Sequence, residues 1–114
     1  MSSNPDWPAE LDGVIADPGH HEVLFENSEV RVVRTIVPAG ETTPVHTHPK
    51  SVTYVVSGID LVRRDESGNV MLDTRNEDVT FSVPSVRWSD GTPPHSIENP
   101  SSEDLVVIAV ELKA

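Results

Sequence analysis

Prolines and short runs of β-branched residues are the features that most constrain the fold of this chain. Ten prolines are spread through 114 residues, and each one lacks an amide hydrogen and fixes φ, which disfavours helix interiors and central strands. No segment of helical length carries apolar residues at a spacing of about 3.6. The apolar runs between the prolines are short, and they include residues 30–37, 52–56 and 105–110. About nine or ten short strands at such spacing predict an all-β sandwich or barrel.

The boundary of this predicted domain follows from a change in composition near residue 22. Residues 1–22 contain Pro5, Pro8 and Pro18 among acidic residues, which predicts an irregular N-terminal arm. The strand-like texture begins at Val23, so residues 23–114 form the predicted barrel. Within it, residues 78–83 alternate apolar and polar side chains, as expected for a half-buried strand.

The charge of the chain excludes several classes of partner. There are 19 Asp and Glu residues against 8 Lys and Arg, which gives a net charge of −11. Such a surface repels phosphate backbones and anionic membranes. No apolar run approaches the roughly 18 residues of a membrane span, and the first residues lack the basic and apolar stretches of a secretory signal. We therefore expect a cytoplasmic protein that binds neither nucleic acid nor a membrane.

His46 and His48 are the sharpest chemical feature of the sequence. Residues two apart in a strand project from the same face, and the flanking Pro44 and Pro49 keep this stretch extended. Imidazole is a common ligand of transition metals, and the chain has no cysteine that would supply a thiolate. His95 lies far enough along the chain to come from the opposite side of a barrel. The three histidines therefore predict a site for a divalent metal ion, which would be Fe, Zn, Ni or Mn.

Two other groups of polar residues carry less chemical information. His20 and His21 are adjacent, so in a strand their side chains point to opposite faces, and both cannot bind one metal ion. We expect them to be solvated, or one of them to lie just outside the ligand shell. Ser89 and Asp90 precede His95, but no nucleophile elbow surrounds the serine, which argues against a hydrolase.

Two stretches of the chain resemble the two motifs of the cupin superfamily. Residues 40–48, with the histidine pair at their end and Gly58 beyond, are similar to the first motif, which reads Gly, five residues, His-x-His, three or four residues, Glu, six residues, Gly. Residues 85–99 are similar to the second, whose final His-x-x-x-Asn is present as His95 and Asn99. The resemblance covers about residues 23–112 and applies best to small single-domain bacterial cupins. It implies an all-β, jelly-roll-like double-stranded β-helix barrel.

The first motif lacks its glutamate. Counting back from Gly58, the glutamate position falls on Ser51, and no carboxylate stands between His48 and Gly58. The resemblance then implies a site of three histidines, like that of the cysteine dioxygenase and diketone-cleaving dioxygenase cupins, with open positions for water, oxygen or substrate. Ser51 would be an outer-shell group, since its hydroxyl is a poor ligand. In the second motif, Asp90 and Thr92 occupy the proline and glycine positions.

Several further side chains are predicted to surround the metal or the pocket. Tyr54, Ile97 and Ile108 are expected to wall the pocket, although packing within the barrel suits Tyr54 and Trp88 better than a role as a substrate platform. The predicted outer-shell and pocket residues are Ser51, Tyr54, Arg87, Trp88, Ile97 and Asn99.

The arginines of the predicted strands divide between two faces. Arg87 precedes Trp88, so the two side chains point opposite ways, and Arg87 faces either solvent or the mouth of the pocket. Arg63 and Arg64 divide in the same way. A buried arginine would hold the carboxylate of a substrate, but solvated arginines are expected.

Three functions remain open at this level. The first is a mononuclear metal-dependent dioxygenase that acts on a small molecule, with His46, His48 and His95 as ligands. The second is a non-enzymatic cupin that binds a small ligand or regulates. The third is an isomerase or epimerase of sugars, which rests on analogy of fold alone. Because exposed strand edges are usually paired or covered, we also expect a homodimer built through edge strands.

Overall fold

Two antiparallel sheets form from the short β-branched runs. The computed structural model describes residues 4–76 and 83–113. Short helical turns precede the strands, and the turns between the strands fall at glycines, asparagines and prolines. The elements are η1 (Ala9–Leu11), α1 (Gly13–Ala16), β1 (His21–Glu26), β2 (Val30–Val37), β3 (His46–His48), β4 (Ser51–Ser57), β5 (Val62–Asp65), β6 (Val70–Asp73), β7 (Ser85–Ser89), β8 (Thr92–Glu98) and β9 (Leu105–Leu112).

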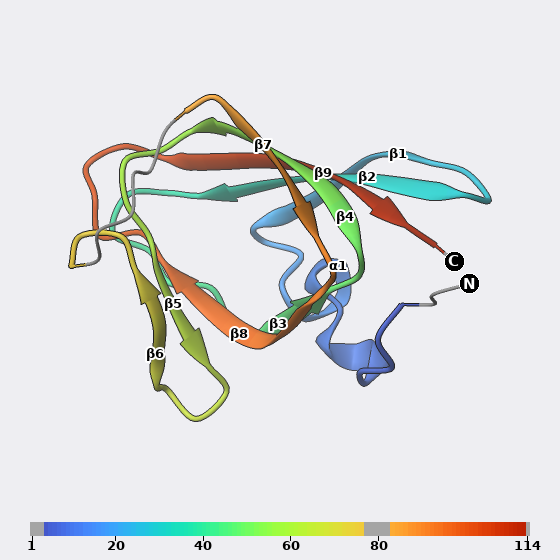
Figure 1. Ribbon diagram of the computed structural model, residues 1–114, viewed down its shortest axis with the longest axis horizontal. Coiled ribbons are helices and arrows are strands. Elements are labelled where there is room, and N and C mark those ends of the chain that lie inside the picture. Colours follow the sequence, from blue (N-terminus) through green and yellow to red (C-terminus); the bar gives the residue numbers. More distant parts are fainter. Residues whose placement is uncertain (1–3, 77–82, 114) are drawn as a thin grey trace.

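The sheets face each other as the two layers of a barrel (Figure 1). One sheet has the strand order β1-β2-β9-β4-β7, and the other has the order β3-β8-β5-β6. The longest pairing joins β2 to β9, from Val30 opposite Leu112 to Val37 opposite Leu105. The order of the strands follows crossovers between the sheets rather than the sequence. This architecture confirms the predicted all-β fold.

The apolar core and the histidines occupy different parts of the interior. Val37, Val55 and Leu105 form a buried cluster, against which Leu61, Ile97 and Val107 pack. This cluster lies where β2 ends and β9 begins, whereas β3 and α1 lie toward the other end of the barrel (Figure 1). One part of the interior therefore stabilises the fold by apolar burial, and the other is left for polar side chains.

The N-terminal segment is more ordered than the predicted arm. It contains η1 and α1, and β1 begins at His21 rather than at Val23. Asp12 bridges to Thr47 of β3, so the segment lies against the strand that carries the histidine pair.

The predicted strand over residues 78–83 lies outside the described residues except for Val83. The predicted homodimer stays a prediction, and among the described residues no helix is long and apolar enough to cross a membrane.

Candidate metal site

His46 and His95 are direct partners across two neighbouring strands. His46 of β3 pairs with His95 of β8, and their ring centroids are 4.4 Å apart. The ring of His48 lies 4.7 Å from that of His46 and 5.4 Å from that of His95. The structure therefore brings the three predicted histidines together. The expectation that His95 comes from the opposite side of the barrel is wrong, because the crossover between the sheets makes β8 the neighbour of β3.

His21 joins this group, although the sequence indicated a solvated or outer-shell residue. Its side chain is fully buried, and its ring lies 4.7 Å from that of His46 and 5.3 Å from that of His48. Among the described residues, nitrogens of His21, His46 and His48 lie within 4.8 Å of one another. Alternation correctly separates His21 from His20. However, β1 starts early enough to turn His21 inward, while His20 bonds Asp17 and Glu41.

Backbone carbonyls fix the tautomer of three of these rings. The Nδ1 atoms of His46 and His95 lie 2.7 Å from the carbonyl oxygens of Pro44 and Pro93. In the same way, Nδ1 of His21 lies 2.9 Å from the carbonyl oxygen of Asp17. A carbonyl only accepts, so each Nδ1 carries the hydrogen and each Nε2 of a neutral ring keeps a lone pair. Fixing Nδ1 in this manner is how proteins orient histidines that bind a metal through Nε2.

The donor set fits a divalent transition metal ion. Nε2 of His21 is buried and has no hydrogen-bond partner, which is costly for a polar atom unless something else binds it. A cation placed among His21, His46 and His48 would satisfy this atom. Imidazole nitrogens without thiolates suit Fe, Zn or Ni, and His95 lies against the group as a further donor.

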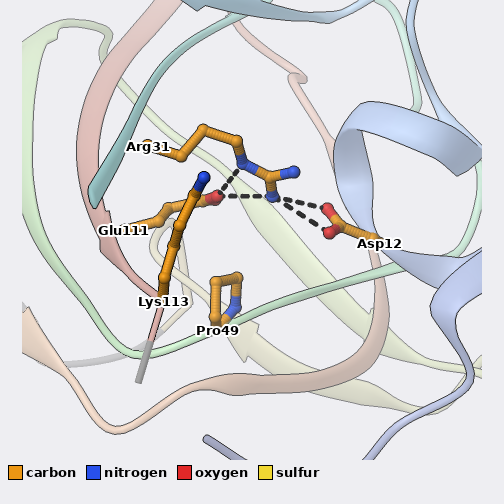
Figure 2. Close-up of a pocket in the computed structure, with 5 residues that line it drawn as sticks. All are labelled: Asp12, Arg31, Pro49, Glu111 and Lys113. Carbon is orange, nitrogen blue, oxygen red and sulfur yellow. Dashed lines mark hydrogen bonds and ion pairs between the residues drawn. The ribbon is translucent and has the colours of Figure 1, made fainter. Parts of the chain in front are cut away.

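The buried carboxylate of Glu111 lies beside His48, and Figure 2 shows the pocket that Glu111 lines. Oε2 of Glu111 is 3.5 Å from Nδ1 of His48, and the glutamate side chain is only 2% exposed. Arg31 donates to Glu111 Oε1 from Nε and Nη2, and its Nη2 also donates to both carboxylate oxygens of Asp12. These groups line a pocket together with Pro49 and Lys113. Glu111 therefore places a negative charge beside His48, and Arg31 balances it.

Burial keeps His21, His46 and His95 neutral. Loss of solvent, with the neighbouring His48 and His95, lowers the pKa of His46 from 6.5 to about 2. Loss of solvent and the charge of His48 lower the pKa of His95 to about 3. Burial also lowers the pKa of His21. Neutral imidazole is the form that binds a metal ion, so these rings are ready for a metal at neutral pH.

The same burial predicts that the metal-free protein loses stability in acid. An unfolded histidine takes up a proton below about pH 6.5, whereas buried His46 and His95 do not until far lower pH. The unfolded chain then binds more protons, so the free energy of unfolding falls as the pH is lowered below 6.5, by up to about 1.4 kcal/mol per pH unit for each such histidine. Urea unfolding of metal-free protein between about pH 5 and 7 measures this slope. In a His46→Asn variant the free energy of unfolding should depend less steeply on pH. An unchanged slope would contradict the conclusion that His46 is buried in its neutral form.

Gly13 leaves no room for a side chain beside the histidines. A Cβ added there would lie 2.9 Å from Nε2 of His21 and 3.0 Å from Cε1 of His48. We expect Gly13→Ala to weaken metal binding and to lower the free energy of unfolding by about 1–3 kcal/mol, since a packed interior resists an added methyl group. Gly19→Ala is the matched control, because its Cβ meets nothing within 4 Å. Equal metal affinities and stabilities in the two variants would contradict the conclusion that Gly13 has no room for a side chain.

Three of the other predicted residues face the interior. Ser51 is buried at the glutamate position of the first motif, and its hydroxyl bonds Thr53. Ile97 packs against the apolar cluster. Asn99 is fully buried, but its amide donates to the carbonyl oxygens of Val37 and Glu103 while its oxygen accepts from the Ser101 amide. Asn99 therefore holds the loop between β8 and β9 instead of a ligand.

The aromatic residues of the prediction face outward. Ser51, Thr53 and Val55 of β4 point into the barrel, so the alternate Tyr54 points out and is 40% exposed. Trp88 is 53% exposed, and its indole nitrogen donates to Asp90. Ile108 pairs with Tyr54 and shares its face. The expectation that Tyr54, Trp88 and Ile108 pack inside the barrel or wall a pocket is therefore wrong. The sequence showed alternation here but not which face was inside.

Comparison with known proteins identifies the fold. No protein-family model matches the sequence, and no curated protein matches it either. A cupin domain from Bordetella pertussis Tohama I is 25% identical, with a TM-score of 0.61 over 82% of this chain and 92% of that one. An RmlC-like cupin family protein with a double-stranded β-helix fold from Methanocaldococcus jannaschii is 14% identical, with a TM-score of 0.59 over 99% and 91% of the chains. A predicted oxalate decarboxylase from Thermotoga maritima is 24% identical, with a TM-score of 0.54 over 82% and 79%.

These similarities define the fold class and the superfamily. The two facing sheets are a double-stranded β-helix, as in the solved structures that the chain resembles. The chain belongs to the cupin superfamily. Its cluster of inward histidines, on a cupin fold, indicates a metal site.

Proposed function

We propose that this protein binds one divalent metal ion at its inward-facing histidines and uses it as a dioxygenase of a small molecule. The observation that carries the proposal is the shared geometry of His21, His46 and His95, whose Nδ1 hydrogens are held by carbonyls. Each neutral ring therefore keeps a lone pair on Nε2, and the rings crowd against one another inside the barrel. A bound ion would supply Lewis-acid or redox chemistry to a ligand beside it.

The protein's own residues prepare the site for that ion. The carbonyls orient the rings, burial keeps them unprotonated, and Glu111 places a negative charge behind His48. A ligand set of neutral imidazoles leaves the positive charge of a divalent ion largely uncompensated. Such an ion attracts electron-rich ligands more strongly than one held by several carboxylates. This property favours activation of a small molecule over simple storage of the metal.

The test has one arm for metal and one for turnover. Protein purified without an affinity tag is analysed for metal, beside a His46→Ala/His48→Ala double variant. We expect about one ion per wild-type chain and none in the variant, and equal near-zero contents would overturn the metal site. Iron-reconstituted protein is then assayed for oxygen uptake with a panel of thiols, diketones and small acids. Bound iron without uptake on any of them would overturn the dioxygenase.

A non-enzymatic cupin is the second candidate, and one observation favours it. The N-terminal segment closes over the histidines so tightly that Gly13 has no space for a Cβ. If His95 joins the other three histidines, four ligands would complete a tetrahedral zinc site, which is the arrangement of structural rather than catalytic zinc. A large thermal stabilisation by Zn²⁺, with no turnover of any substrate, would support this candidate.

A further inference from the structure

Arg63 points into the barrel. It pairs with Ile97 of β8, and directly paired residues of antiparallel strands share a face. Ile97 packs against the apolar cluster of the interior. The neighbouring Arg64 faces the other way and forms an ion pair with Glu98 at 2.7 Å. The expectation of a solvated arginine therefore holds better for Arg64 than for Arg63.

Among the residues that the structure describes, Arg63 has no partner for its charge. Its Nε is buried without a hydrogen bond, and within the described part of the chain no carboxylate pairs with it. Burial, followed by the nearby positive charge of Arg87, lowers the pKa of Arg63. Placing a guanidinium away from water without an anion is expensive. Elsewhere in the described chain, the half-buried Arg31 is satisfied by two carboxylates, so Arg63 is an exception that needs an explanation.

Arg87 approaches the same region from the other sheet. It pairs with Thr53 of β4, which lies on the inward face between buried Ser51 and Val55. Its side chain is exposed, as expected at the mouth of the barrel on an edge strand, and no described residue forms an ion pair with it. Within the described part of the chain, Arg63 and Arg87 are thus two cations on opposite sheets without a carboxylate partner, and the charge of Arg87 acts on Arg63.

The arginine pair lies on the His95 side of the metal site. Asp65, two residues after Arg63 on the same strand, pairs with His95, while Arg63 pairs with Ile97 of the same strand β8. An anion held by the two arginines would thus reach a position beside the metal ligands.

We propose that Arg63 and Arg87 bind the carboxylate group of a small-molecule ligand inside the barrel, next to His95. A guanidinium presents parallel N–H donors that match the two oxygens of a carboxylate, and an anion between two cations relieves their repulsion. A neutral ligand would do neither. This inference deepens the proposed function, because it names the chemical class of the ligand at the same site.

The test is a titration with acetate and propionate, with acetamide and propionamide as uncharged controls of similar shape. Binding to the protein as purified is followed by NMR in a low-chloride buffer. We expect the carboxylates to bind and the amides not to bind. Arg63→Gln and Arg87→Gln should each weaken carboxylate binding by roughly tenfold or more. Arg64→Gln is the matched control, since it removes an outward arginine from the same strand, and it should bind like the wild type.

The outcomes separate this inference from the metal site. Each variant is also analysed for metal, and the titration is repeated after a chelator has removed the metal. Arginine-dependent binding in metal-free protein supports the inference even if no metal site exists. Unchanged binding in Arg63→Gln, no binding of either carboxylate, or tighter binding of inorganic phosphate would overturn it. If a variant fails to fold, the Nε–Hε signal of Arg63 in the wild type decides, because acetate should shift it and acetamide should not.

Discussion

Replacing His46 or His21 by alanine should weaken metal binding by roughly a hundredfold or more, since even residues behind the ligands often contribute ten- to a hundredfold. His46 lies at the centre of the cluster, with its ring within 4.7 Å of those of His21, His48 and His95. His21 contributes a buried Nε2 that has no other partner. Removing either ring deletes a lone pair whose orientation the fold has already fixed.

The His21 variant is the decisive one, because the sequence predicted a site without it. Metal affinity is measured by competition with a chromophoric chelator, using protein whose fold is checked by circular dichroism. His20→Ala is the matched control, since His20 turns away to bond Asp17 and Glu41 and should leave the affinity near that of the wild type. If His21→Ala binds metal normally while His95→Ala does not, the three-histidine site predicted from the sequence is right and the role given to His21 is wrong.

The fold was predictable because the signals for it are local and repeated. Prolines and β-branched runs recur along the whole chain, and each disfavours helix at its own position. His46, His48 and His95 were predictable for a similar reason, since their spacing within short segments matches known motifs. His21 was not, because its direction depends on where β1 begins. In the structure β1 starts two residues before Val23, so His21 and Val23 lie on the same face of the strand. This spacing of two residues is the signal for His21 that the sequence contains.

The prediction for the aromatic residues was wrong for a different physical reason. Alternation says that Tyr54 and Val55 face opposite ways, but it does not say which of them is inside. The register decides this, because Val55 packs with Val37 and Leu105 while Tyr54 faces out. The partner of each strand is set by long-range pairing, as between His46 and His95. Pairing at such distances along the chain is beyond what the local pattern of one sequence specifies.

The missing glutamate of the first motif has a counterpart in space. Ser51 pairs across to Glu111 of β9, and the carboxylate of Glu111 reaches to within 3.5 Å of His48. The negative charge that the motif would place on β4 is therefore supplied from the adjacent strand. Because the carboxylate oxygen of Glu111 lies beside Nδ1 of His48, its position indicates that Glu111 orients the ring of His48 and does not bind the metal ion.

Glu111→Gln should therefore affect both stability and metal affinity. The substitution removes a buried charge from Arg31, which retains Asp12, and we expect the free energy of unfolding to fall by about 3 kcal/mol. It also removes the charge beside His48, so metal affinity should fall by roughly ten- to a hundredfold. Urea unfolding of metal-free protein measures the first effect, and chelator competition under folding conditions measures the second.

The second effect distinguishes a positioning residue from a purely structural one. Glu98→Gln is the matched control, because Glu98 pairs with Arg64 on the outer face, where both side chains are 33% exposed. An ion pair of that kind contributes under about 1 kcal/mol, and its loss should leave metal affinity unchanged. If Glu111→Gln lowers stability yet binds metal as tightly as the wild type, then Glu111 serves only to balance Arg31. A loss of metal affinity in Glu111→Gln but not in Glu98→Gln would instead show that β9, the strand adjacent to β4, supplies the negative charge beside His48.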